Sequence, residues 1–180
     1  MKIPLAIDEI HIPEDVQVSV EKDLVTVAGP KGKLVRNLDN PRIHIMLENG
    51  NVVVKCEMPR KREKALVGTY SAHISNMIRG VTKGFTYKMK VVYAHFPIKV
   101  SVKDKKVNID NFLGEQYPRT AQIYGDAQVI VKGDSITIEG INREEVGQTA
   151  ANIERAVRVR RRDIRIFQDG IYITSKDRST

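Results

Sequence analysis

The sequence predicts an α+β fold made of two tandem copies of one small module, each an antiparallel sheet with one helix packed on one face. The first observation is an internal repeat, in which three segments recur in the same order roughly 80 residues apart. The second is a change of hydrophobic period within each copy, from the period of a strand to that of a helix. Such repetition indicates a duplicated module. The repeated segments are residues 16–20 with 98–102, residues 45–55 with 129–139, and the stretches that begin at Gly68 and Gly147.

Each copy is expected to open with two β-hairpins. Apolar and polar residues alternate in the opening strands, and a short charged turn leads into each returning strand. The turns of the second hairpins contain Gly50 and Gly133, which can adopt the positive φ that tight turns require. The expected hairpins lie at residues 16–27 and 43–56 in the first copy, and at residues 98–109 and 127–139 in the second.

One helix is expected to follow the hairpins in each copy. Asn142 and Glu145 form a capping-box pattern at the start of the second helix, and Gly80 is expected to end the first. A strand should then close each copy, at residues 85–89 in the first and from Ile164 to Ile173 in the second. The buried helix faces are expected to consist of Val67, Ser71, Ile74 and Ile78, and of Val146, Ala150, Ile153 and Val157.

The domain boundary is expected between residues 80 and 96. We place the first module at residues 1–82 and the second at residues 83–180. Because the linker is short, the strand at residues 85–93 could join either sheet. Domains of this size bury too little surface to be very stable alone, so each copy is expected to be stabilised by contacts with the other copy or with a partner.

Composition favours a folded basic protein that does not enter membranes. Hydrophobic residues make up 41% of the chain, and the net charge of +8 points to a polyanionic partner, most simply nucleic acid. The only cysteine, Cys56, excludes internal disulfides and cysteine-based zinc clusters, and it is expected to be a buried thiol in a cytosolic protein. The N-terminus turns acidic before a secretory hydrophobic region could form, and no apolar run approaches the ~20 residues of a membrane span.

The main candidate for a binding surface is a cluster of arginines after the second helix. The dipole of a helix favours cations at its C-terminus by ~0.3–1 kcal/mol each, which accounts for one or two of them. Arginine also offers a planar fork that suits phosphate oxygens, so an RNA-facing surface is favoured over a merely solvated helix end. The candidate phosphate contacts, here called the arginine cluster, are Arg158, Arg160, Arg161, Arg162 and Arg165.

Two further basic segments are secondary candidates. Arg60 and Arg62 enter the first helix at the end where its dipole disfavours cations, and only Glu63 compensates them. An anionic partner near this helix end would explain the arrangement. Lys31 and Lys33 lie in a glycine-containing loop, where backbone amides could approach an anion.

No constellation typical of catalysis or of cofactor binding is found. Gly32 and Lys33 are followed by Leu34, so the Ser or Thr of a phosphate-binding loop is missing. The four histidines show no ligand spacing, and none is expected to pair with a carboxylate; His44 and His73 should pack in or beside the core. We expect that the protein is not an enzyme and that it binds no metal, cofactor or small-molecule substrate. With no Trp and 6% aromatic residues, base stacking should be a minor mode of binding.

The chain resembles the L-six family of large-subunit ribosomal proteins, in its archaeal and eukaryotic form. The resemblance rests on the tandem repeat, on residues 25–34 (VTVAGPKGKL) and on residues 165–172 (RIFQDGIY), and it covers about Ile12 to Lys176. It implies a ribosome-bound, cytoplasmic structural protein with neighbouring ribosomal proteins as partners. It also implies binding to large-subunit ribosomal RNA near the translation-factor-binding region and the sarcin–ricin loop, mainly through the second module. The chain departs from the family pattern at Arg155, where glutamine is usual.

On this basis the arginine cluster should contact phosphates, with Lys31, Lys33, Arg60 and Arg62 as secondary contacts. Three residues beside the cluster are expected to shape the turn: Gly170 through a positive φ, Asp169 by local capping and Phe167 by packing. Two alternatives remain at this stage. One is a free-standing RNA-binding module that acts outside the ribosome, and the other is an RNA-processing enzyme.

Overall fold

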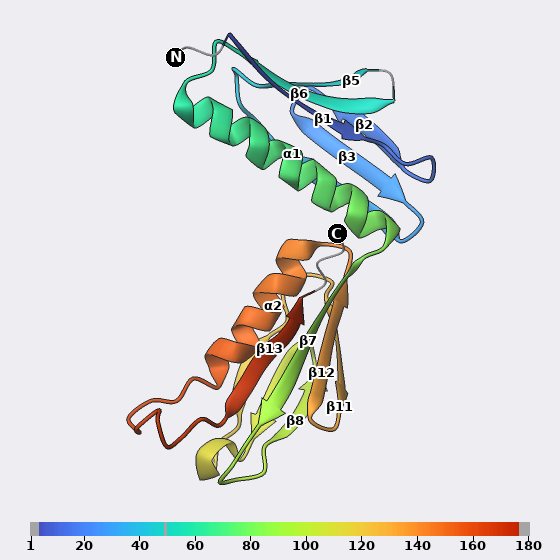
Figure 1. Ribbon diagram of the computed structural model, residues 1–180. Coiled ribbons are helices and arrows are strands. Elements are labelled where there is room, and N and C mark those ends of the chain that lie inside the picture. Colours follow the sequence, from blue (N-terminus) through green and yellow to red (C-terminus); the bar gives the residue numbers. More distant parts are fainter. Residues whose placement is uncertain (1–3, 49, 177–180) are drawn as a thin grey trace. The chain divides into compact units, whose positions relative to one another are not determined.

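The computed structural model describes residues 4–48 and 50–176 and has the α+β architecture expected from the sequence. The chain forms two compact units that divide between Gly84 and Phe85, and in the described residues each unit combines antiparallel strands with one long helix (Figure 1). Within the described residues each unit has two antiparallel sheets, where the sequence predicted one. The two hairpins of a unit do not hydrogen-bond into a continuous sheet, and the residues of both contribute to one core beneath the helix.

The first unit contains two three-stranded sheets and the helix α1 (Lys61–Thr82). One sheet has the order β1-β6-β5 and the other the order β2-β3-β4. β1 was not predicted from the sequence; it alternates half-buried and exposed residues and pairs with β6. The strands are β1 (Leu5–His11), β2 (Gln17–Glu21), β3 (Leu24–Gly29), β4 (Gly32–Asn37), β5 (His44–Glu48) and β6 (Asn51–Glu57).

The second unit repeats this plan and adds one strand. Its sheets have the orders β10-β9-β8 and β11-β12-β7-β13, and its helix is α2 (Arg143–Ala156). β7 pairs with β12 as β1 pairs with β6, so β7 opens the second unit instead of closing the first. β13 lies on the other side of β7. The remaining elements are β7 (Phe85–Val92), β8 (Lys99–Lys103), β9 (Lys106–Asp110), a 3-10 turn (Phe112–Gly114), β10 (Arg119–Gln122), β11 (Gln128–Lys132), β12 (Ser135–Gly140) and β13 (Gly170–Lys176).

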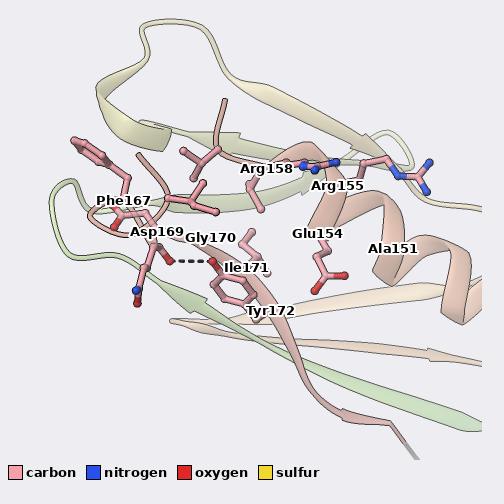
Figure 2. A pocket seen from close by; sticks show the side chains of 13 residues that line it. Ala151, Glu154, Arg155, Arg158, Phe167, Asp169, Gly170, Ile171 and Tyr172 are labelled. Carbon is pink, nitrogen blue, oxygen red and sulfur yellow. Dashed lines mark hydrogen bonds between the residues drawn. The ribbon is translucent and has the colours of Figure 1, made fainter. Parts of the chain in front are cut away.

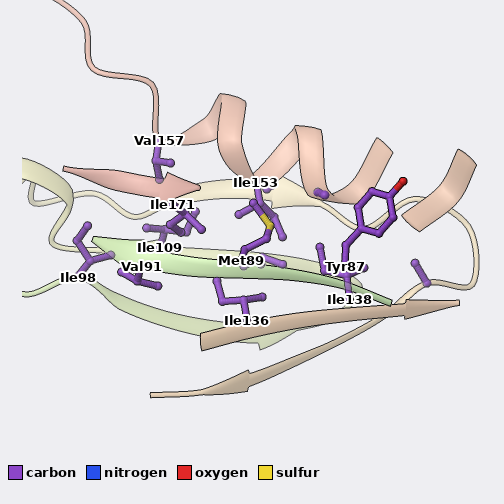
Figure 3. Close-up of a cluster of buried hydrophobic side chains, with 14 of the residues drawn as sticks. Tyr87, Met89, Val91, Ile98, Ile109, Ile136, Ile138, Ile153, Val157 and Ile171 are labelled. Carbon is purple, nitrogen blue, oxygen red and sulfur yellow. The ribbon is translucent and has the colours of Figure 1, made fainter. Parts of the chain in front are cut away.

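The two cores confirm the repeat residue by residue. The corresponding pairs Val25 and Val107, Val27 and Ile109, Val52 and Ile136, and Val54 and Ile138 are all completely buried. Every residue expected on the two buried helix faces is buried as well. Cys56 is a buried free thiol. In the second unit, Ile153 of α2 packs against side chains of β7, β12 and β13 (Figure 3).

Helix and strand ends differ from expectation at three places. α1 continues through Gly80 because Val81 packs fully into the core, and Gly84, with φ of +78°, follows the helix end. Asn142 caps α2 by accepting a hydrogen bond from the Glu144 amide (3.1 Å), but Glu145 accepts from the side-chain amide of Asn142 (3.0 Å) in place of its backbone.

The third difference concerns the closing strand of the second unit. It begins at Gly170, whereas the sequence suggested Ile164. Ile164 and Ile166 are 69% and 62% exposed, so they do not belong to a buried strand. The carbonyl of Asp163 accepts hydrogen bonds from the amides of Ile166 and Phe167, which closes a tight turn there. Neither helix of the described chain is long and apolar enough to cross a membrane.

Candidate nucleic-acid interface

The arginine cluster lies on a loop that connects α2 to β13, residues 158–169, here called the arginine loop. All five arginines of the cluster are exposed. The loop has no regular secondary structure, yet hydrogen bonds with distant parts of the unit hold both of its ends. It therefore presents several cations on one short segment of defined position.

Arg119 of β10 holds the start of the arginine loop. Its Nη1 donates hydrogen bonds to the carbonyl oxygens of Ala156 (2.9 Å) and Arg158 (3.0 Å). Ala156 is the last residue of α2 and Arg158 follows just after it, so no further turn of helix offers amides to these carbonyls. A side-chain cation at a helix C-terminus is also favoured by the helix dipole.

The rest of the Arg119 guanidinium is fixed as well. Nε and Nη2 donate to the two carboxylate oxygens of Glu115 (2.7 and 2.6 Å), and Arg119 lies 4.4 Å from the centre of the Phe112 ring. The hydrogen bonds from Arg119 lower the pKa of Glu115, although burial opposes this effect. Sequence reasoning missed Arg119, because its carbonyl partners are 37 and 39 residues away.

Asp169 holds the other end of the arginine loop. Its carboxylate is almost completely buried and accepts hydrogen bonds from the backbone amides of Ala94 (3.0 Å) and His95 (3.4 Å). The ring Nδ1 of His95 lies 3.3 Å from Oδ1 of Asp169. Burial alone would raise the pKa of Asp169, but these hydrogen bonds outweigh it and lower the pKa. The expectations of local capping by Asp169 and of no histidine–carboxylate pair were therefore wrong.

Phe167 and Gly170 complete this anchor. The Phe167 ring packs on the ring of His95, with centroids 4.6 Å apart, and the guanidinium of Arg162 lies 4.8 Å from the Phe167 centroid. Packing by Phe167 is thus confirmed. Gly170 does not have a positive φ, contrary to expectation. Its lack of a side chain is needed for another reason, because a Cβ there would stand 3.0 Å from the Tyr172 ring.

A groove of about 520 Å³ adjoins the arginine loop (Figure 2). It lies between the C-terminal half of α2 and the segment that leads into β13. Apolar side chains such as Val157 and Ile171 line it together with charged and aromatic ones. The charged and aromatic lining residues are Glu154, Arg155, Arg158, Phe167, Asp169 and Tyr172.

The structure does not bring the secondary candidates together. Lys31 lies in the β3–β4 turn, where its amide donates to the carbonyl of Val81 (2.9 Å) and its ammonium group donates to the carbonyl of Lys83. Lys31 thus ties this turn to the C-terminal end of α1. Lys33 is exposed on β4.

Arg60 and Arg62 lie at the opposite end of α1. A helix of 22 residues is about 33 Å long at 1.5 Å per residue, so these arginines are far from Lys31. Glu63 accepts a hydrogen bond from the Arg60 amide and pairs with Arg42 (2.6 Å). These hydrogen bonds, that from Arg60 first, lower the pKa of Glu63. The side chains of Arg60 and Arg62 remain exposed.

The fold and this surface define a class of protein: a duplicated α+β chain with an exposed, anchored arginine loop on its second unit. Within residues 4–48 and 50–176, no group of three or more His, Cys, Asp or Glu residues could hold a metal ion.

Comparison with known proteins identifies the family. The model of the family described as Ribosomal protein L6 matches residues 12–84 and 96–170, so the chain belongs to the ribosomal protein L6 family. The large ribosomal subunit protein uL6 of Methanobrevibacter smithii is 54% identical over 170 residues, which cover 94% of this chain and 96% of that protein. The protein of the same name from Methanocella arvoryzae is 52% identical, and the match covers 93% of this chain and 96% of that protein. The one from Methanosphaera stadtmanae is 56% identical, and the match covers 93% of this chain and 91% of that protein.

Proposed function

We propose that this protein is a structural constituent of the large ribosomal subunit that binds large-subunit ribosomal RNA near the translation-factor-binding region. Its relatives are named as large-subunit proteins, and they match along nearly their whole length. The observation that carries the proposal is the arginine loop, where five exposed arginines share one segment held at both ends. On this proposal the protein is ribosome-bound in the cytoplasm, beside other ribosomal proteins.

The arginine loop suits phosphate binding because it is already fixed in position. A flexible basic segment would lose conformational freedom on binding, and this loss would weaken the complex. Arg119 and Asp169 hold the ends of the loop before any RNA arrives. Guanidinium groups then bind phosphate oxygens in pairs of hydrogen bonds, which position the protein and read RNA shape with little sequence discrimination.

The secondary candidates have different standing in this proposal. Lys33, Arg60 and Arg62 are exposed and available for phosphates. The ammonium group of Lys31 would have to leave the carbonyl of Lys83, so Lys31 is the weakest of the proposed contacts. Because α1 separates the two pairs, they would bind different stretches of RNA.

The test is binding of the purified protein to large-subunit ribosomal RNA and to a length-matched duplex RNA, across a salt series. Each phosphate contact steepens the fall of log affinity with log salt by roughly 0.7–0.9. Changing Arg160, Arg161 and Arg162 together to Ala should therefore reduce the slope by about 2–3 and abolish most of the preference for ribosomal RNA.

The matched control removes three exposed lysines from the same unit, at Lys103, Lys106 and Lys132. It lowers the net charge equally and should leave the preference for ribosomal RNA intact. Equal binding of the unchanged protein to both RNAs would contradict the proposal, as would equal effects of the two triple variants. Retention in large subunits through a high-salt wash would separate a ribosomal constituent from a module that acts outside the ribosome.

A further inference from the structure

The groove beside the arginine loop has features that phosphate binding does not require. Its apolar lining includes Ile164, which is 69% exposed, above the buried Val157 and Ile171. A volume of about 520 Å³ lies within the range of about 300–1,000 Å³ that small-ligand pockets occupy. An apolar groove next to a cationic loop suits a group that is flat, apolar on its faces and attached to a phosphate.

Tyr172 supplies an aromatic surface in this groove. Its hydroxyl donates a hydrogen bond to the carbonyl of Gln168 (2.9 Å), and its ring lies against the bare Cα of Gly170. The ring is therefore fixed on one side, while the residue remains 43% exposed. Aromatic rings with accessible faces stack the unpaired bases of RNA. A ring that is already fixed loses little freedom when a base binds.

Charged groups are arranged around this ring. Arg155 and Arg158 line the groove at the end of α2, and Arg158 also belongs to the arginine cluster. Glu154 extends from α2 toward the ring of Tyr172 (Figure 2). The arginines suit the phosphate of a bound nucleotide, whereas the carboxylate of Glu154 would repel it and must face another part of the ligand.

We propose that this groove holds one unstacked guanine of the bound RNA, with its base on Tyr172, its phosphate at Arg155 and Arg158, and its edge at Glu154. A carboxylate only accepts hydrogen bonds, and it has two oxygens to do so. The Watson–Crick edge of guanine offers two adjacent donors, the ring N–H and the exocyclic amino group. Adenine and cytosine offer only an amino group beside an acceptor, and uracil places its one N–H between two carbonyls. This inference rests on the proposed binding of ribosomal RNA, and it adds a base-reading site to a surface that otherwise contacts phosphates.

The first experiment measures the affinity for large-subunit ribosomal RNA of Y172L, of Y172F and of a control, Y124L. Tyr124 is also exposed in the second unit but lies outside the groove. Loss of one stacked base should weaken binding about 5- to 150-fold in Y172L. Y172F keeps the ring without its hydroxyl and should restore most of the lost affinity. The salt slope should be the same in Y172L as in the unchanged protein, because no charge is removed.

The second experiment follows the amide signals of Glu154, Gly170 and Tyr172 by NMR during titration with GMP, AMP, CMP or UMP. All four carry the same phosphate, so a difference among them reports the base. GMP should shift these signals at the lowest concentration, and E154Q should remove that preference, because its amide both donates and accepts.

The outcomes separate this inference from the proposed function. If ribosomal RNA is preferred and the arginine triple variant lowers the salt slope, but Y172L binds as well as Y124L, the groove holds no base. Equal loss in Y172L and Y172F would assign the effect to the hydroxyl contact with Gln168, and would also overturn the stacked base. If Y172L does not fold, the nucleotide titration still decides, since identical responses to all four nucleotides would refute the guanine site.

Discussion

Arg119 should be the residue on which the position of the arginine loop depends most, and R119M tests this. The change keeps an unbranched apolar chain but removes the guanidinium that binds the carbonyls of Ala156 and Arg158. Two hydrogen bonds from a charged group would contribute about 1.5–3 kcal/mol each if fully buried. The Arg119 side chain is 23% exposed, so values below that range apply.

The remaining contacts of Arg119 are worth less. Its ion pair with Glu115, whose side chain is 41% exposed, contributes at most about 1 kcal/mol. The contact with the Phe112 ring adds about 0.5–1 kcal/mol, part of which a methionine would retain. Together, R119M should lower the free energy of unfolding of the second unit by about 2–3 kcal/mol.

Urea unfolding followed by circular dichroism measures this loss, and hydrogen exchange at the amides of Arg158 and Val159 should accelerate. E115Q is the control, because it weakens the ion pair and leaves the contacts to the helix carbonyls; it should cost less than about 1 kcal/mol. A loss below about 0.5 kcal/mol in R119M, or an equal loss in E115Q, would refute the idea that the guanidinium holds the helix end. RNA affinity should fall in R119M even though none of the arginine cluster is changed.

Two other predictions concern stability. Because folding lowers the pKa of Asp169, the carboxylate's contribution to the free energy of unfolding should be complete above the unfolded pKa of about 3.9. This contribution should disappear as the pH falls through the lower pKa of the folded state. D169N should therefore lower the free energy of unfolding by about 2–3 kcal/mol near neutral pH, and its stability in urea titrations should depend less on pH in the acid range. A steeper acid dependence in D169N would contradict this assignment. Thermal melts should show that G29A destabilises the first unit by about 1–3 kcal/mol, because its Cβ would stand 2.7 Å from a methyl carbon of the buried Val81. G68A is the contrasting change on α1, where a Cβ meets no neighbouring atom, and it should stabilise the unit by about 0.5–1 kcal/mol.

The parts of the fold that depend on local pattern were predictable from the sequence. Alternating apolar residues and turn glycines located the hairpins, and the helical period located α1 and α2 with their buried faces. The repeat also relates Val25 to Val107 from the sequence alone. The hydrophobic periods of strands and helices depend on residues close together in the chain, so a single sequence is enough to reveal them.

The parts that depend on long-range pairing were not predictable. β7 follows α1 directly in the chain, and only its hydrogen bonds to β12 show that it belongs to the second unit. The arginine cluster was predicted as a charged segment, and the structure places it on an exposed loop. The contacts that hold this loop, Arg119 to Arg158 and Asp169 to Ala94, join residues far apart in sequence. The hydrophobic periods of strands and helices do not reveal such long-range pairs.

The position of β7 has a consequence for anyone who divides this protein. The second stretch that matches the family model begins at residue 96, after β7 has ended at Val92. A fragment cut at that residue would lack β7, the strand that lies between β12 and β13, together with its buried residues Phe85 and Met89. It would lose the middle of its larger sheet, and β13 would have no neighbour to pair with. A separable second half must therefore begin at Phe85, so the unit of sequence similarity is shorter than the unit of folding.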